Sequence, residues 1–120
     1  MSNPISPSEV NQNSFGLTTR DMLTIQNILK KYPVIKKVNV FGSRAKGNFK
    51  KGSDIDLAIM NENVSEDVIL KLITDFEESS LPYRVDIVNY PTLTDSTLKE
   101  HIDRVGKLID LSFIIKNNTE

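Results

Sequence analysis

The sequence predicts an α/β protein of the α+β type, in which a small mixed sheet carries helices on one face and a binding site on the other. Segments rich in β-branched residues alternate with segments whose apolar residues recur at helical spacing. In the strand expected over residues 54–60, apolar and acidic side chains alternate. Such alternation is typical of a sheet that is covered on one face and open to a ligand on the other.

The first helix is expected to begin at Thr18 or Thr19, because either hydroxyl could cap its first turn. Apolar residues then recur at helical spacing up to Tyr32. Pro33 should end this helix, since the residue before a proline avoids the α region. The next segment, residues 34–41, is rich in β-branched residues and predicts the first strand.

The middle of the chain predicts a turn, a loop, a strand and a helix. Residues 42–47 are expected to form the turn and residues 48–53 a polar loop, after which the strand over 54–60 follows. Ser65 marks the start of the second helix, where the acidic residues that follow it suit the helix dipole. The buried stripe of this helix is formed by Ile69, Leu72, Ile73 and Phe76.

The last third of the chain predicts a strand and a helix. Residues 83–90 have alternating apolar and charged side chains and predict the third strand. Residues 96–105 predict the last helix, with Gly106 as its terminator. Residues 108–115 could add an edge strand or a docking segment. The expected order of elements is α-β-β-α-β-α.

A single domain is expected over residues 17–115, because the 120 residues of the chain suit one domain that buries roughly two-thirds of the surface of its unfolded chain. Residues 1–16 contain two prolines and many polar side chains, which predicts a flexible N-terminal arm. Residues 116–120 are expected to form a C-terminal tail.

The composition excludes several kinds of site and partner. The chain has no cysteine, so it has no disulfide, no thiolate metal site and no thiol nucleophile. No apolar stretch approaches the roughly 18 residues that span a bilayer, and no signal peptide is recognisable, so we expect a cytoplasmic protein without a membrane partner. The formal net charge of −1, with acids and bases interspersed, argues against binding to long nucleic acid.

Two carboxylates open the strand over residues 54–60. Asp54 and Asp56 are one residue apart, so in a strand they leave the same face with α-carbons about 7 Å apart. Carboxylates this close repel each other unless a cation lies between them. Divalent ions, above all Mg²⁺, suit ligands that are all oxygen.

A small-residue turn precedes these carboxylates. Gly42 lets the backbone approach a ligand closely, and Ser43 supplies a hydroxyl beside free backbone N–H groups. These groups could hold the β- and γ-phosphates of a nucleotide, with Arg44 or Lys46 adding positive charge. A phosphate site next to a metal site predicts a nucleotide-binding protein.

Asp86 is a third candidate ligand, because it lies within a strand that is otherwise rich in β-branched residues. If the strand over 83–90 lies beside the strand over 54–60, Asp86 joins Asp54 and Asp56 at about one strand spacing, roughly 4.8 Å. Three carboxylates could then hold two Mg²⁺ ions, the arrangement used for in-line nucleotidyl displacement. Asp86 is also a candidate general base for an acceptor hydroxyl.

These residues resemble those of the nucleotidyltransferases related to DNA polymerase beta, and in particular the minimal nucleotidyltransferases (MNT). The family pattern is Gly-Ser, ten residues and Asp-x-Asp. Here Gly42-Ser43 is followed by the ten residues 44–53 and then by Asp54-Ile55-Asp56. Asp86 matches the third family carboxylate, and the resemblance covers residues 15–109 with no departure at the motif positions. It implies the polymerase beta-like nucleotidyltransferase fold.

The resemblance also implies a partner and a reaction. Short MNT proteins commonly act as antitoxins of a helical HEPN toxin, onto a tyrosine of which they transfer AMP from ATP. The implied site is catalytic and metal-binding Asp54, Asp56 and Asp86, with two Mg²⁺ ions and ATP as the substrate. Larger relatives carry an extra domain for the acceptor, and 120 residues leave little for one, so we expect the acceptor on another macromolecule and an oligomer with that partner.

Two other functions stay open at this stage. The protein could bind nucleotide and neutralise its partner by masking it, without catalysis. It could also adenylylate a small molecule, as antibiotic-modifying relatives do, although the acceptor domain of those enzymes has no counterpart here. Replacing Asp54 and Asp56 separates masking from modification, because a masking protein would still protect cells.

Overall fold

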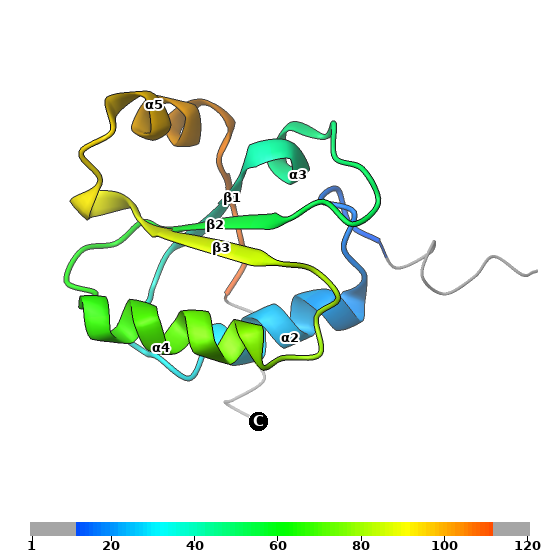
Figure 1. Cartoon of the computed structure of the whole chain (residues 1–120), viewed down its shortest axis with the longest axis horizontal. Coiled ribbons are helices and arrows are strands. Elements are labelled where there is room, and N and C mark those ends of the chain that lie inside the picture. The colour runs from blue at the N-terminus through cyan, green and yellow to red at the C-terminus, as the bar shows by residue number, and fades with distance from the viewer. Residues whose placement is uncertain (1–11, 112–120) are drawn as a thin grey trace, which may run out of the picture.

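The protein is described by a computed structural model that covers residues 12–111. It contains a four-stranded sheet with the strand order β3-β2-β1-β4 (Figure 1). The strands are β1 (Val38–Phe41), β2 (Ile55–Ile59), β3 (Val85–Asn89) and β4 (Lys107–Leu108). β1 is antiparallel to both β2 and β4, whereas β2 and β3 are parallel, which confirms the predicted small mixed sheet.

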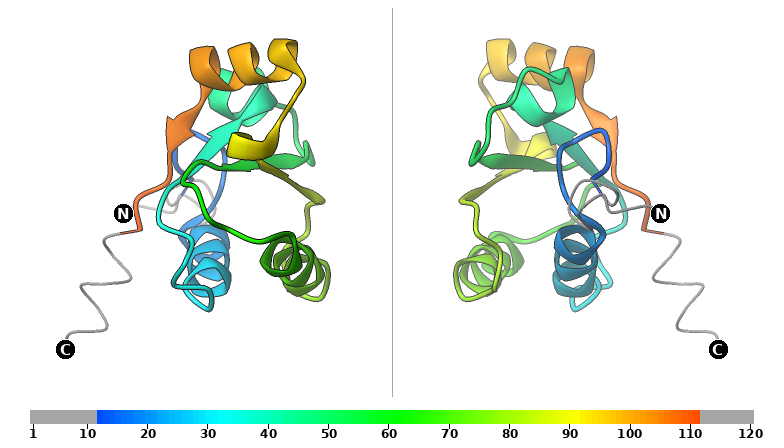
Figure 2. Two further views of the ribbon diagram at one scale, coloured as in Figure 1. Left: turned by 90° about the vertical axis from the view of Figure 1, so that its left-hand side faces the viewer. Right: turned by 90° about the vertical axis from the view of Figure 1, so that its right-hand side faces the viewer.

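Helices lie on both faces of this sheet. They are α2 (Thr19–Leu29), α3 (Gly42–Lys46), α4 (Glu66–Glu77) and α5 (Ser96–Val105), together with the short 3₁₀ helix η1 (Tyr90–Thr92). α2 and α4 lie side by side under one face, and α3 and α5 lie over the other (Figure 2). Within residues 12–111, no helix is long and apolar enough to cross a membrane.

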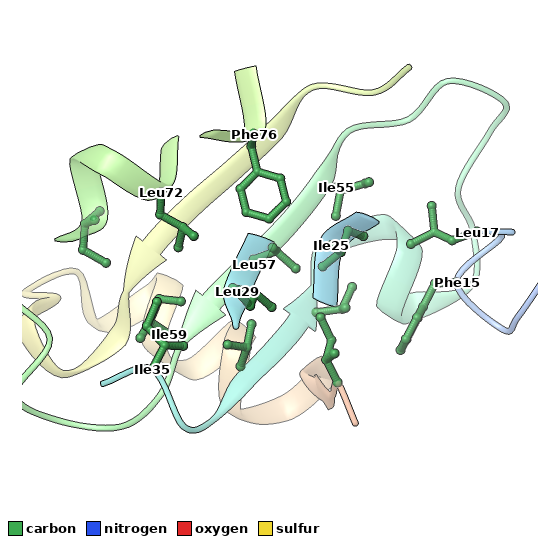
Figure 3. Packing of buried hydrophobic residues seen from close by; sticks show 14 of the residues in the cluster. Phe15, Leu17, Ile25, Leu29, Ile35, Ile55, Leu57, Ile59, Leu72 and Phe76 are labelled. Carbon is green, nitrogen blue, oxygen red and sulfur yellow. The ribbon is translucent and has the colours of Figure 1, made fainter. Parts of the chain in front are cut away.

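The main core lies between the sheet and the layer of α2 and α4. Ile55, Leu57 and Ile59 of β2 have no exposed surface, and they point toward Leu72 and Phe76 of α4 (Figure 3). Because alternate side chains of a strand leave opposite faces, this burial turns the residues between them to the other side of the sheet.

A smaller apolar cluster covers part of that other face. Phe41, Ala58 and Ile102 are buried together there, and Val88 packs against them. α5 and η1 therefore close the end of the face where β2 and β3 finish. The face predicted to be open to a ligand is open only at the end where these two strands begin.

The predicted helix boundaries agree with the structure at most ends. Thr18 caps α2, accepting a hydrogen bond from the backbone N–H of Asp21. Ser65 caps α4 in the same way, and α5 runs from Ser96 to Val105 as predicted and ends at Gly106. α2 is shorter than expected, because the chain leaves the helix after Leu29 through two turn hydrogen bonds before it reaches Pro33.

β1 is also shorter than the predicted strand over 34–41. The backbone N–H groups of Lys36 and Lys37 donate to Oδ1 of Asn61, at 2.8 and 3.0 Å. The side-chain amide of Asn61 thus takes the place of a neighbouring strand, and regular pairing starts only at Val38.

The ends of the chain were predicted as an arm and a tail. Phe15, which the prediction placed in the arm, is buried in the main core. The edge strand expected after residue 107 forms as β4, although it spans only Lys107–Leu108. Residues 1–11 and 112–120, which include the tail predicted over 116–120, lie outside the described residues.

Candidate active site

Asp56 and Asp86 lie side by side on the face of the sheet away from α2 and α4. The parallel register of β2 and β3 makes them direct partners. Ile55 and Leu57 point into the main core, so Asp56 between them leaves the opposite face. Asp54, the residue before β2, follows the same alternation and is exposed. The structure thus brings the three predicted carboxylates to one end of one face.

The carboxyl group of Asp56 shows how closely these acids influence one another. Burial raises its pKa from the ordinary value of 3.8 to about 6, with further contributions from the charges of Asp86 and Asp54 and from a hydrogen bond with Asp86. The charged form is disfavoured because water is partly excluded and two further carboxylates lie close by. Such a group is typical of a site that receives a positive ligand.

Arg84 is a charged neighbour of the site that the sequence reasoning had not assigned to it. Its Nε lies 3.4 Å from Oδ1 of Asp86, and its side chain is 77% exposed. The signal was present in the strand pattern, since residues two apart in a strand share a face and Arg84 precedes Asp86 by two. Arg84 places an exposed positive charge at the outer edge of the carboxylate cluster.

Gly42 connects the small-residue turn to the carboxylates. Phe41, the last residue of β1, is the register partner of Asp56, so the chain turns into α3 directly beside that carboxylate. Gly42 has a φ of +73°, and a Cβ built on it would collide with Oδ2 of Asp56. Glycine is therefore required both by the backbone conformation and by the closeness of Asp56. Ser43, the next residue, is half-buried at the start of α3.

Arg44 does not lie where the sequence prediction placed it. Its side chain is buried, with 2% of its surface exposed. The guanidinium donates to the backbone carbonyl of Ser53 at 2.8 and 3.1 Å and to that of Phe15 at 2.8 Å. It also stacks between the rings of Phe49 and Tyr83, 5.2 and 4.5 Å from their centroids. These contacts engage the guanidinium group, which the sequence analysis had proposed as a ligand of a phosphate.

Lys46 is the predicted phosphate ligand that stays available. It lies at the end of α3 and is exposed. Arg44 instead holds together three segments around the site: the turn before α2, the loop that ends next to Asp54, and the start of β3. The sequence offered no signal for this role, because the partners of Arg44 are spread over the chain from Phe15 to Tyr83.

The donors at this site suit a divalent cation. All three candidate ligands are carboxylates, the oxygen donors that Mg²⁺ prefers, and a cation would relieve the repulsion that raises the pKa of Asp56. Within residues 12–111, however, no three acidic, histidine or cysteine side chains stand close enough together to enclose a metal ion. Asp86 pairs with Arg84 instead. The two Mg²⁺ ions therefore stay a prediction.

A glycine-serine turn beside carboxylates on two adjacent strands is the arrangement that the sequence predicted for a nucleotidyltransferase. Residues 24–112 match the family described as "Polymerase beta, Nucleotidyltransferase". The match spans well over half of the chain. The protein belongs to this family and is a nucleotidyltransferase, as the resemblance had implied.

One relative in sequence supports this assignment, and two solved structures share the fold. The chain is 34% identical over 94 residues to the Haemophilus influenzae protein named "Probable protein adenylyltransferase MntA", an alignment covering 78% of this chain and 82% of that protein. Its fold is similar to that of a toxin–antitoxin crystallised with AMP-PNP, with a TM-score of 0.61, 23% identity and coverage of 73% of this chain and 71% of the other. A mutant of the toxin–antitoxin MntA–HpeT gives a TM-score of 0.58, 20% identity and coverage of 72% and 70%.

Substituting Gly42 tests the contact between the turn and Asp56. We expect Gly42→Ala to lower nucleotidyl transfer by about 10²-fold, because the new methyl group must displace the carboxylate and a shift of about 1 Å at a reacting group has this effect. Gly52→Ala is the matched control, since Gly52 has a similar φ of +84° and no atom lies within 4 Å of its Cβ position. Steady-state rates of both variants, read beside their thermal melts, separate backbone strain from the collision. Equal rates for the two variants would contradict the assigned role of Gly42.

A second pair of variants distinguishes the roles of Arg44 and Lys46. Arg44→Lys should lower the free energy of unfolding by about 1–3 kcal/mol, because an ammonium group reproduces neither the fork of donors nor the ring stacking. Lys46→Ala should leave stability within about 0.5 kcal/mol, as exposed substitutions do, and should weaken ATP binding. Urea denaturation and a titration with a fluorescent ATP analogue measure the two effects. If Arg44→Lys weakened ATP binding with unchanged stability, Arg44 would be the phosphate ligand after all.

Proposed function

We propose that this protein is a Mg²⁺-dependent adenylyltransferase that transfers AMP from ATP to a hydroxyl group of a partner toxin and thereby acts as an antitoxin. The observation that carries the proposal is the register of β2 and β3, which sets Asp56 beside Asp86, with Gly42 held against the same carboxylate. The name of the Haemophilus influenzae relative, a protein adenylyltransferase, supports a polypeptide acceptor. The toxin–antitoxin crystallised with AMP-PNP supports a toxin partner and an adenine nucleotide.

Each part of the site has a distinct task in this proposal. The hydroxyl of Ser43 and the backbone N–H groups after Gly42 hold the β- and γ-phosphates, and Lys46 adds charge to them. Asp54, Asp56 and Asp86 would hold Mg²⁺, which, when bound, offsets the negative charge that builds up on the phosphates. Gly42 keeps the phosphate-binding turn at a fixed distance from Asp56, because nothing larger fits between them.

The reaction replaces the phosphoanhydride bond between the α- and β-phosphates of ATP by a phosphate ester to the acceptor. The acceptor oxygen forms a bond to the α-phosphorus of ATP, and the bond from that phosphorus to the bridging oxygen breaks, so pyrophosphate leaves. Asp86 is the candidate base for the proton of the acceptor hydroxyl, since it is on the outermost of the two strands that carry the acids. Arg84 beside it is placed to pair with negative charge that develops at the leaving or transferred phosphate.

The partner in this proposal is a helical HEPN toxin, and the acceptor is a tyrosine of that toxin. A tyrosine hydroxyl needs a base close to it, because its ordinary pKa of about 10 keeps it protonated at neutral pH. The site offers Asp86 for this purpose. An antitoxin of this kind works in the cytoplasm, where both ATP and the toxin are found.

The double variant Asp54→Asn with Asp56→Asn tests the catalytic proposal. It should lower the transfer of label from α-labelled ATP to the partner toxin by about 10³-fold or more, because asparagine amides cannot supply the negative charge of the two carboxylates. Asp67→Asn, an exposed acid of α4 paired only with Lys71, is the control and should transfer at the wild-type rate. If the double variant fully protected cells and the wild type labelled no toxin, the protein would act by masking the toxin and not by modifying it.

A further inference from the structure

β3 is an edge strand in the part of the chain that the structure describes, with β2 as its one neighbour. The backbone N–H of Ile55 donates to the carbonyl of Arg84 at 2.9 Å, so Arg84 directs its backbone groups toward β2. Backbone groups of successive strand residues point to alternate sides. Val85 and Ile87 therefore direct their N–H and C=O groups to the free side, as a template for another strand.

A cleft lined by both apolar and charged residues lies directly under this free edge. It has a volume of about 440 Å³ and is formed between β3 and the second half of α4. Its apolar lining consists of Ile73, Phe76, Leu81, Val85 and Ile87. The side chains of Val85 and Ile87 face this cleft, and all five residues of β3 are only half-buried, whereas four of the five in β2 are buried. The edge thus combines free hydrogen-bonding groups with a pocket for side chains.

The opposite side of the same edge carries the outermost carboxylate. Asp86 and Arg84 also border the cleft, but by the alternation of the strand their side chains leave the face opposite to Val85 and Ile87. A strand added to β3 would lie about 4.8 Å away, and its side chains would alternate between the cleft and the face of Asp86. One residue of such a strand would be the direct neighbour of Asp86, with its own neighbours on both sides directed into the cleft.

We propose that the free edge of β3 binds the acceptor segment of the partner polypeptide as an added strand, which places the acceptor residue next to Asp86 and apolar residues on either side of it in the cleft. This inference rests on the proposed function, because it names how that acceptor is delivered. Strand addition of this kind draws its affinity from backbone hydrogen bonds and its specificity from alternate side chains.

The charges at the edge favour this occupant over two others. A nucleic acid would bring phosphates against Asp86 and Glu77, with Arg84 as the one cation that lines the cleft. A second copy of the chain, paired through β3, would set two carboxylate clusters against each other, and like charges on facing strands are destabilising. An extended polypeptide with apolar residues around a hydroxyl-bearing one meets neither obstacle.

A peptide probe tests the inference on the full chain. The probe is a fluorescein-labelled nine-residue peptide with a central tyrosine flanked by valines, and its binding is followed by fluorescence anisotropy in the presence of Mg²⁺ and AMP-PNP. The comparison peptide has the same sequence with the three central residues N-methylated, which removes their backbone donors. We expect saturable binding of the first peptide and a dissociation constant at least about tenfold higher for the second.

Variants of the protein provide the matching evidence. Ile87→Pro removes an N–H that faces the free side and spares the hydrogen bonds to β2, as proline does on edge strands. Ile73→Ser removes an apolar wall of the cleft, and Leu70→Ser, at an exposed position of α4 outside the cleft, is its control. Ile87→Pro and Ile73→Ser should each weaken peptide binding about tenfold, and Leu70→Ser should not. Binding of AMP-PNP and the melting temperature show that each variant is folded.

The outcomes separate this inference from the proposed function. Equal binding of the two peptides, no binding of the first peptide, or wild-type affinity in both variants would overturn strand addition at β3. AMP transfer to the intact toxin, measured separately with the wild-type protein, would still stand in each of those cases. Conversely, the peptide could bind with the expected sensitivity to N-methylation and to the two variants, while no AMP is transferred to any polypeptide. That result would overturn the proposed reaction and leave the docking edge standing.

Discussion

The pairing of β2 with β3 is the constraint on which the rest of this site depends. In the parallel register, Asp56 and Asp86 become direct neighbours, although they lie thirty positions apart in the sequence. The core fixes which way they face, because the residues on either side of Asp56 are fully buried against α2 and α4. Two carboxylates are thereby forced together on the other face, where burial and mutual repulsion raise the pKa of Asp56. A site with such a deficit of positive charge is prepared for a cation.

Gly42 and Arg44 keep the surroundings of the carboxylates in place. Gly42 permits β1 to turn into α3 against Asp56, since no side chain fits there. Arg44 then connects the first turn of the domain, the loop before Asp54 and the segment leading into β3 through three hydrogen bonds to two backbone carbonyls and contacts with two aromatic rings. The neighbouring Lys46 is exposed, and its proposed role in binding the nucleotide stays a prediction.

Local patterns in the sequence predicted most of the elements and the candidate carboxylates. The helix over Ser96–Val105 and the caps Thr18 and Ser65 followed from side-chain chemistry within a few residues. The burial of Arg44 could not be predicted, because its partners come from segments that meet only in the folded chain. The position of α5 over the second face could not be predicted either. The apolar stripe of an amphipathic helix shows that the helix packs on something, but not which face of a sheet it covers. The length of β1 was overestimated, because the side chain of Asn61, in a distant loop, accepts the hydrogen bonds of Lys36 and Lys37 in place of a neighbouring strand.

The convergence of three acids on one end of the sheet can be measured without any activity. In the metal-free protein, a ¹³C NMR titration of the aspartate carboxyl groups should show Asp56 with a pKa of about 6. In Asp86→Asn this pKa should fall toward the ordinary value of 3.8, because one of the charges that disfavour ionisation is gone. An ordinary pKa for Asp56 in the wild type, unchanged in Asp86→Asn, would show that the acids do not meet, and the proposed site would have to be abandoned.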